Sequence, residues 1–275
     1  MGFRLGSVSP MDGRQIPLVM GVVNVTADSF FPGSRTAEID ASIERGLRLF
    51  AEGAAIVDVG GESSRPGATP VAEADELARV IPVIEALSRA GRVSVDTVKP
   101  AVARAAAAAG STLINDVSGT LAVVAAELGI GWVAMHAQGT PSTMQDDPRY
   151  DDVVAEVAKW LDDAATAASN AGVGEIWLDP GIGFGKTAAH NWSLLRHTDV
   201  LASLAERHGA QVLVGTSRKR FLGDGPDGVL EVDDRLAGSL ATAIAAIEGG
   251  AQMVRVHDVD ATVQATRLMA EEMVA

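Results

Sequence analysis

Short apolar segments rich in Val, Ile and Leu alternate along the chain with longer segments in which Ala and Leu recur at helical spacing. The apolar segments run on without alternating polar residues, which is typical of strands buried on both faces in a parallel sheet. This pattern predicts eight strands, at Leu18–Val25, Ala55–Val59, Val93–Asp96, Leu113–Asn115, Trp132–Met135, Ile176–Asp179, Gln211–Val214 and Met253–Val256.

The segments between the predicted strands have the pattern of helices. Examples are Ala37–Ala51, Ala72–Arg89 and Asp151–Ala171. The stretch "KPAVARAAAAAG" places Pro100 at a first helical position, continues with a run of the strongest helix former, and ends at Gly110. The chain is therefore interpreted as a series of strand–helix units.

The number of these units predicts the fold. Eight strand–helix units in 275 residues match the count and the size of a (β/α)8 barrel, the TIM-barrel fold of the α/β class. A doubly wound open sheet with fewer strands is the alternative, because the fourth predicted strand is short. No shift in composition and no Pro- or Ser-rich linker marks a boundary, so we expect a single domain over residues 1–275.

Polar and ionisable residues stand at or just after the ends of the predicted strands. They are Asn24, Asp58, Asp96, Asn115, His136, Asp179, Ser217, Arg218, Lys219, Arg255 and His257. A single Asp or Asn at such a position can equally be the N-cap of the next helix. Lys219, Arg255 and His257 are poor N-caps, however, and all strand ends of a barrel meet at one face, where barrel enzymes carry their active sites. The set therefore predicts a shared polar cavity.

The stretch "IWLDPGIGFGKT" resembles a phosphate-binding loop because it ends in Gly-Lys-Thr. In such a loop a glycine would stand where this chain has Pro180. We therefore expect Asp179 to end a strand inside the barrel mouth and Pro180–Gly181 to turn the chain away. Phe184, between two glycines, would then form a wall of a ligand pocket.

Asp96, Asn115 and Asp179 together offer hydrogen-bond acceptors to a flat ligand. A ring edge with adjacent N–H donors, as in guanine or a pterin, matches two carboxylates and an amide. The opposite rim would carry positive charge, from Arg65, Lys219, Arg255 and His257. Asn24 adds a hard oxygen suited to Mg²⁺. We expect a donor-edged heterocycle at the floor of the cavity and an anion, for example a diphosphate, at its lip.

The composition of the chain limits the classes of partner that we expect it to bind. The formal net charge is −14 without a compensating cluster of Lys and Arg, which argues against a nucleic-acid partner. No apolar run reaches the roughly 18–20 residues of a membrane helix, and the first residues lack the features of a signal peptide. The sequence has no cysteine, which excludes disulfides and thiolate metal sites and is consistent with a cytoplasmic protein.

Seven segments, in this order, resemble the dihydropteroate synthase family, whose members are pterin-binding TIM barrels. They are "MGVVNVTADSF" (20–30), "VDVGGESSRPGA" (57–68), "SVDT" (94–97), "INDVSG" (114–119), "LDPGIGFGKT" (178–187), "SRKRFLG" (217–223) and "VRVHDV" (254–259). The resemblance extends from about Met20 to Val259. It implies an enzyme of folate synthesis that joins p-aminobenzoate to 6-hydroxymethyl-7,8-dihydropterin diphosphate, releasing diphosphate and 7,8-dihydropteroate.

The resemblance also implies roles for individual residues. The pterin would be bound by Asp96, Asn115, Asp179 and Lys219, with Arg255 packed against its ring. The diphosphate would be held by Arg255, His257 and, through Mg²⁺, Asn24. The p-aminobenzoate site would be formed by Ser64, Arg65, Pro66, Phe184 and Ser217. The catalytic set would be Asp96, Arg65, Lys219, Arg255 and His257. Sulfonamides as inhibitors and a homodimer are further implications.

One segment departs from the family pattern. The family usually has Asp-Ser-Phe-Ser-Asp-Gly-Gly where this chain has Asp28 to Ser34, so Pro32 replaces the second acid. This change leaves a catalytically weak pterin-binding paralogue as an alternative. A methyltetrahydrofolate-to-corrinoid methyltransferase is another pterin-binding barrel, but it would not need "ESSRPGA" or the basic rim.

Overall fold

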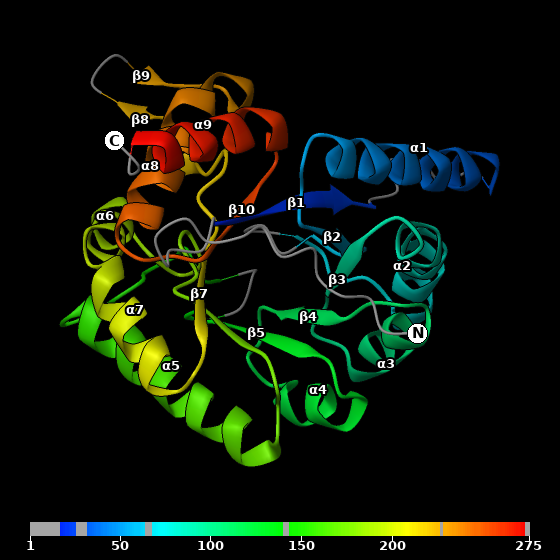
Figure 1. The fold of residues 1–275 in the computed structure, drawn as a ribbon, viewed down its shortest axis with the longest axis horizontal. Helices are drawn as coiled ribbons and strands as arrows, with labels where there is room; N and C mark the ends of the chain where they lie inside the picture. Colours follow the sequence, from blue (N-terminus) through cyan, green and yellow to red (C-terminus); the bar gives the residue numbers. More distant parts are fainter. Residues whose placement is uncertain (1–16, 26–31, 64–67, 140–142, 226–227, 273–275) are drawn as a thin grey trace.

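The computed structural model describes residues 17–25, 32–63, 68–139, 143–225 and 228–272. Eight parallel strands form a closed barrel in the order β1-β10-β7-β6-β5-β4-β3-β2, and helices surround it (Figure 1). The strands are β1 Leu18–Asn24, β2 Ile56–Gly60, β3 Arg92–Asp96, β4 Leu113–Asp116, β5 Gly131–Met135, β6 Ile176–Asp179, β7 Gln211–Val214 and β10 Met253–Val256. The predicted (β/α)8 barrel is confirmed, and the open-sheet alternative is wrong because β1 pairs with both β2 and β10.

The helices follow the strands along the chain. They are α1 Pro32–Ala51, α2 Glu73–Leu87, α3 Pro100–Ala108, α4 Ala122–Leu128, α5 Val153–Ala171, α6 Ala188–Arg196, α7 Thr198–Arg207, α8 Leu236–Glu248 and α9 Val259–Glu272. Between β7 and α8 lie a short hairpin, β8 Asp224–Gly225 and β9 Gly228–Val229, and two 3-10 turns, η1 Arg220–Leu222 and η2 Val232–Arg235. No helix within these described residues is both long enough and apolar enough to cross a membrane.

The strand boundaries predicted from the apolar pattern agree with the structure to within one residue, and β6, β7 and β10 agree at both ends. The largest difference is at α1, which begins at Pro32 and not at Ala37. Proline favours a first helical position because its φ is already helical and its missing N–H would be unpaired there. Of the segment Asp28–Ser34, which departs from the family pattern, residues 28–31 lie outside the described residues, and residues 32–34 begin α1.

Local sequence explains where the longer helices begin and end. Asp152 caps α5, because its Oδ1 accepts hydrogen bonds from the backbone N–H groups of Val154 and Ala155 at 3.0 and 3.1 Å. The same helix ends at Gly172, whose φ of 89° lies in the left-handed region. α3 begins at Pro100, as the sequence predicts, and stops just before Gly110.

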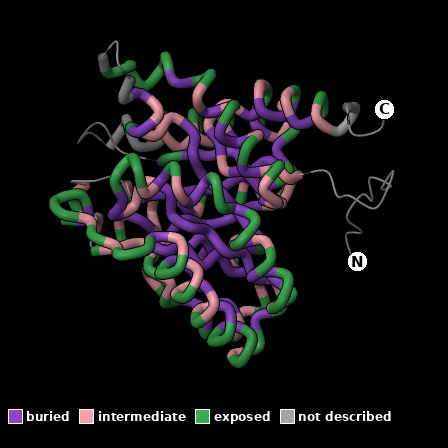
Figure 2. Tube along the Cα trace, turned by 90° about the vertical axis from the view of Figure 1, so that its left-hand side faces the viewer, coloured by how far each residue is buried: buried purple, intermediate pink, exposed green. Residues whose placement is uncertain are grey.

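Buried residues follow the strands and the inward sides of the helices, and exposed residues lie around the outside (Figure 2). The core has two parts. The larger fills the space between the strands and the helices. The smaller part fills the interior of the barrel toward the amino-terminal ends of the strands. Its residues are Met20, Ile56, Leu113, Val133, Trp177, Leu213 and Met253. The single-domain organisation over residues 1–275 stays a prediction.

Candidate active site

The alternation of side chains along a strand positions the polar residues of the barrel mouth. Residues i and i+2 of a strand face the same side. Ile56, Leu113, Trp177 and Met253 belong to the apolar cluster inside the barrel. Two positions further along the same four strands stand Asp58, Asn115, Asp179 and Arg255. These four side chains therefore face the barrel interior one layer above the apolar cluster, at the carboxyl end of the strands.

Arg255 joins residues of four strands into one network at the floor of this mouth. Its Nε donates to Asp58 Oδ2 at 2.7 Å, and its Nη2 donates to Asp96 Oδ2 at 2.9 Å. Asn115 Nδ2 donates to the same Asp58 oxygen at 2.9 Å. The carboxylates of Asp58 and Asp96 are buried, so the guanidinium compensates charges that would otherwise be costly.

Several buried acceptors of this floor have no partner among the described residues. They are Asp58 Oδ1, Asn115 Oδ1 and the hydroxyl of Ser94. Buried polar atoms in native proteins are nearly always hydrogen-bonded, so unpaired ones on three neighbouring strands indicate a place for a ligand or ordered water. A carboxylate oxygen and an amide oxygen accept hydrogen bonds only. The floor is therefore complementary to a ligand edge that carries donors.

Burial shifts the protonation of the mouth residues. It raises the pKa of Asp96 to about 7; Arg255 opposes the shift and Asp58 adds to it. Burial also raises the pKa of Asp179, against the charge of Lys219. The pKa of Lys219 falls to about 8 because of burial, although Asp179 opposes this. Desolvation therefore brings an acid and a base of the mouth close to neutral pH, as is common in active sites.

The loop after β6 wraps around Lys219. Asp179 Oδ1 accepts a hydrogen bond from Gly181 N at 2.7 Å, which makes the sharp turn expected after this strand. Lys219 Nζ donates to the carbonyl of Ile182 and lies 4.6 Å from the centroid of the Phe184 ring. Gly183, at a φ of 84°, leaves room for the lysine stem. Phe184 and Lys219, both predicted pocket residues, are thus in contact.

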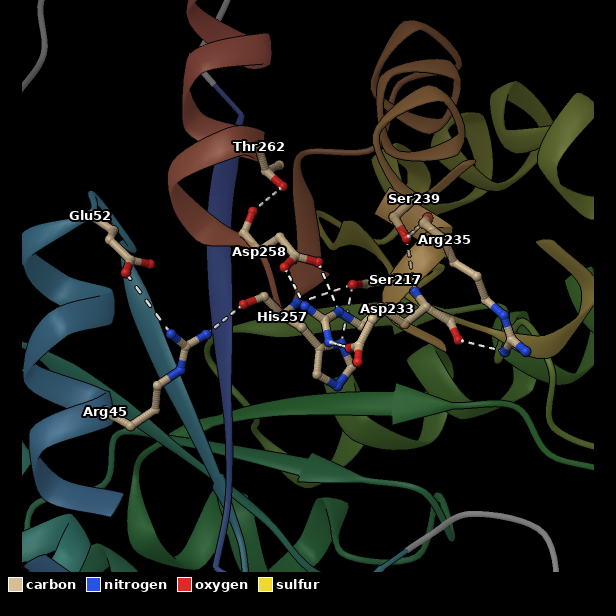
Figure 3. A network of polar contacts seen from close by, with 10 residues as sticks. Arg45, Glu52, Ser217, Asp233, Arg235, Ser239, His257, Asp258 and Thr262 are labelled. Atoms are coloured by element: carbon tan, nitrogen blue, oxygen red, sulfur yellow. Dashed lines mark hydrogen bonds and ion pairs between the residues drawn. The ribbon is translucent and has the colours of Figure 1, made fainter. Parts of the chain in front are cut away.

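The rim is formed where β7 and β10 end, and it is shown in Figure 3. Ser217 Oγ accepts a hydrogen bond from the backbone N–H of His257 at 3.1 Å and lies 3.1 Å from its Nδ1. Arg218 forms two hydrogen bonds with the carboxylate of Asp258, at 3.0 and 2.6 Å, and one with Asp233 at 3.0 Å. These pairs hold Arg218 in the left-handed region, at a φ of 58°, between Ser217 and Lys219. The segments that follow β7 and β10 are therefore fixed to each other.

Asn24 stands apart from this network. Asn24 is exposed at the carboxyl end of β1, and strand register connects it through Gly60 to Asp96. A single amide oxygen at an open rim fits Mg²⁺, which keeps several waters and binds mainly through substrate phosphates. No group of three or more His, Cys, Asp or Glu side chains that could hold a metal exists among the described residues. Ser64, Arg65 and Pro66 lie outside the described residues.

Two residues of the site were not assigned a role from the sequence. Asp58 was recognised as a strand end, but only the structure shows that it holds both Arg255 and Asn115. Lys186 is buried beside the loop after β6, with its Nζ 2.9 Å from His136 Nδ1 and 3.1 Å from the carbonyl of Phe184. Burial lowers the pKa of Lys186 to about 7 and that of His136 to about 3. The contacts of Lys186 with His136 and with the Phe184 carbonyl connect the loop after β6 to the end of β5. The sequence signal for Lys186 was its place at the end of a glycine-rich turn.

Comparisons with known proteins agree with this geometry. The family described as "Pterin binding enzyme" matches residues 20–257. The dihydropteroate synthase of Escherichia coli (strain K12) is 44% identical over 266 residues, which cover 92% of this chain and 90% of that protein.

Solved structures give the same result. The dihydropteroate synthase of Xanthomonas albilineans with 4-aminobenzoic acid superposes with a TM-score of 0.84 at 46% identity, and the match covers 94% of both chains. The Yersinia pestis dihydropteroate synthase with a sulfonamide drug complex superposes with a TM-score of 0.85 at 40% identity, over 94% of this chain and 95% of that one. The likeness therefore extends over nearly the whole length.

Proposed function

This chain belongs to the family of pterin binding enzymes, and we propose that it catalyses the dihydropteroate synthase reaction. It condenses p-aminobenzoate with 6-hydroxymethyl-7,8-dihydropterin diphosphate to give 7,8-dihydropteroate and diphosphate, which makes it a transferase. The observation that carries the proposal is the floor of the barrel mouth, where Arg255, Asp58, Asp96 and Asn115 form one buried network in which Asp58 Oδ1 and Asn115 Oδ1 have no hydrogen-bond partner.

The floor binds the pterin through its donor edge. The 2-amino group and the ring N–H groups of a pterin are adjacent donors, and Asp96, Asn115 and Asp179 supply acceptors on three strands. Lys219 is close enough to Asp179 to act on its pKa, and Arg255 donates a hydrogen bond to Asp96. Both cations can therefore contact polar atoms of the ring while their own charges stay compensated by the carboxylates.

The chemistry consists of one substitution at the pterin methylene carbon. The C–O bond to diphosphate breaks, a C–N bond to the arylamine forms, and the new ammonium nitrogen loses one proton to solvent. Arg255 and His257 bind the departing diphosphate, whose developing charge they stabilise. Asn24 would hold Mg²⁺, which supplies further charge stabilisation to the leaving group when bound. An arylamine is a neutral nucleophile at pH 7, so no strong general base is required.

The arylamine site lies on the other side of the pterin. Phe184, Ser217 and the segment Ser64–Pro66 form it in this proposal. Support comes from the 4-aminobenzoic acid bound to the Xanthomonas albilineans relative and from the sulfonamide bound to the Yersinia pestis relative. Sulfonamides are therefore proposed to inhibit this enzyme by competing with p-aminobenzoate.

A coupled assay tests the function. Diphosphate release is measured with the pterin diphosphate alone and with p-aminobenzoate added, and 7,8-dihydropteroate is quantified in parallel. We expect release that depends on p-aminobenzoate and matches product formation one to one. The alternative of a weak paralogue predicts tight pterin binding with little product, and release without p-aminobenzoate would indicate hydrolysis in place of condensation.

A homodimer in the cytoplasm completes the proposal. β9, α8 and α9 lie on the same side of the barrel (Figure 1), and five exposed apolar residues belong to these elements or to the segment between β9 and α8. They are Val229, Leu230, Val232, Leu236 and Leu268. Such a group of apolar side chains is typical of a protein interface, and the absence of cysteine is consistent with the cytoplasm.

Sedimentation of Leu236→Glu and Leu268→Glu variants tests the dimer. Both should shift the wild-type dimer to monomer, whereas the control Val123→Glu, an exposed apolar position on α4, should not. A monomeric wild-type protein would contradict this part of the proposal.

A further inference from the structure

Four consecutive backbone carbonyls of the loop after β6 each accept a hydrogen bond from a side chain. The pairs of carbonyl and donor residue are Ile182 with Lys219, Gly183 with Gln145, Phe184 with Lys186, and Gly185 with Tyr150. We infer that Gln145 and Tyr150 are positioning residues for the arylamine site, because they hold the backbone on both sides of Phe184. The inference rests on the proposed function, which assigns Phe184 to p-aminobenzoate.

The two positioning residues belong to the segment between β5 and α5. Gln145 Nε2 donates to the carbonyl oxygen of Gly183 at 2.6 Å, and the Tyr150 hydroxyl donates to that of Gly185 at 3.0 Å. These carbonyls stand directly before and directly after Phe184 in the chain. One neutral donor therefore fixes the backbone on each side of this residue.

The loop after β6 lies directly on the segment after β5. A Cβ added at Gly181 would overlap the carbonyl oxygen of His136, and a Cβ added at Gly185 would overlap that of Gln138. Glycine permits this close approach, but it also leaves the backbone more conformational freedom than other residues do. Because glycines flank Phe184 on both sides, its position depends on the side chains that bind the neighbouring carbonyls.

The Tyr150 side chain is itself held in place. Its ring centroid lies 5.0 Å from that of His190 and 6.1 Å from that of His136. The side-chain amide of Gln138 donates to the carbonyl of Arg149 at 2.9 Å and accepts from the Arg149 backbone N–H at 3.1 Å. Burial raises the pKa of Tyr150 to about 12, so its hydroxyl stays protonated and can donate. Tyr150→Phe therefore removes one donor and keeps the packing of the ring.

Phe184 is the residue through which both donors act. It is half-buried, and its ring centroid lies 4.6 Å from Lys219 Nζ. Loss of a neighbouring hydrogen bond should let the ring leave this place, and small misplacements of a group that contacts a substrate are costly. Gln145 and the protonated Tyr150 carry no charge, so removing their donors leaves the charges around the pterin floor unchanged.

The kinetic test compares Gln145→Met, Tyr150→Phe and the double variant with Gln264→Met. Gln264 is an exposed glutamine of α9 whose amide donates to Asp260, so it is a matched control for loss of one amide. The KM for p-aminobenzoate should rise about fivefold in each single variant and about tenfold or more in the double variant. It should stay unchanged in Gln264→Met, and kcat should stay within about twofold throughout.

Phe184→Ala distinguishes an effect through the ring from a general loss of order. In this background, the changes at Gln145 and Tyr150 should alter the KM by less than about twofold, because the ring that they position is absent. An unchanged KM in the double variant, or the same rise with and without the Phe184 ring, would overturn the inference. An unchanged KM in Phe184→Ala alone would remove Phe184 from the arylamine site and would overturn it as well.

Amide hydrogen exchange tests the positioning without turnover. A peptide covering residues 180–187 should exchange faster in the double variant than in the wild type and in Gln264→Met, because local opening of this loop becomes easier. Equal exchange in all three proteins would overturn the inference. Failure of the proposed function is distinguishable, because the wild-type enzyme would then form no product at all.

Discussion

The interior of the barrel has two layers that differ in chemistry although the same strands build both. In the lower layer, Ile56, Leu113, Trp177 and Met253 are packed against one another and are almost fully buried. In the upper layer, two residues later on each strand, stand Asp58, Asn115, Asp179 and Arg255. One repeat of the strand pleat thus separates residues that stabilise the barrel from residues that serve its ligand.

The two layers contribute to stability with opposite sign. Burial of large apolar side chains in the lower layer is favourable. The upper layer takes charged and polar groups out of water, and its pairs at best offset that cost. Unpaired Asp58 Oδ1 and Asn115 Oδ1 show that the upper layer is not complete by itself. Substitutions in the lower layer should therefore affect unfolding, and substitutions in the upper layer should affect binding.

The largest effect on stability is expected for Trp177→Ala. The side chain is 1% exposed and fills the centre of the lower layer. Its removal leaves a cavity and should lower the free energy of unfolding by about 3–5 kcal/mol. Denaturant unfolding measures this value. A loss below about 1 kcal/mol would mean that the lower layer is not packed as described.

The next largest effect is a pH dependence of pterin binding, which we expect from Asp96 at the carboxyl end of the strands. The folded-state pKa of Asp96 is about 7, so the carboxylate form that accepts from a pterin is lost as the pH falls through 7. The affinity for the pterin diphosphate should then fall by up to about tenfold per pH unit below 7. Asp96→Asn should bind weakly and should lose the part of this dependence that comes from Asp96. A wild-type affinity that is constant from pH 5 to 8 would contradict this role.

Asp96 should affect the stability of the fold in the opposite direction: a fall in pH weakens pterin binding but strengthens the contribution of Asp96 to folding. Its pKa is raised from 3.8 to about 7 in the folded state, so the folded state binds the proton more strongly than the unfolded state. The contribution to stability is full below pH 3.8 and is lost as the pH rises through 7. Unfolding of the wild type and of Asp96→Asn across this range measures the difference between the two curves.

A smaller effect is expected at the rim, for Asp258→Asn. The hydrogen bonds from Arg218 hold the pKa of Asp258 below its ordinary value, and the pair fixes the backbone between Ser217 and Lys219. Loss of the charge should cost about 1 kcal/mol of stability and lower kcat/KM severalfold. Asp260→Asn, an exposed change on α9, is the control. Equal kinetics in both variants would remove Asp258 from this role.

Much of the fold followed from the sequence, and the reason is visible in particular elements. The apolar pattern predicts β6, β7 and β10 at both ends, because buried parallel strands are largely apolar runs bounded by polar residues. In β10 the run is interrupted by Arg255, which faces the barrel mouth. The start of α1 was placed too late because its first residues lack an apolar stripe and begin with proline. Boundaries set by backbone preference are weaker signals than those set by burial.

The site was predictable as a list of residues but not as a network. That Asp96, Asn115, Asp179, Lys219 and Arg255 belong to one mouth follows from the closure of the barrel. Asp58 is the shared partner of Arg255 and Asn115. This pairing depends on the side-chain rotamers that packing in the mouth allows, and the sequence pattern does not encode them. Lys186 illustrates the same limit, because its partners are a histidine side chain and carbonyls from two loops.

Calorimetric titration of the pterin diphosphate into the wild type and into Asp179→Asn tests the central claim, that the upper layer serves the ligand and not the fold. The substitution keeps the shape of the side chain but places an amide donor where the pterin edge also donates. We expect the Kd to rise by at least about 100-fold, equivalent to about 2.7 kcal/mol, with the thermal unfolding midpoint nearly unchanged. Unchanged affinity, or a loss of stability as large as that of Trp177→Ala, would contradict the account.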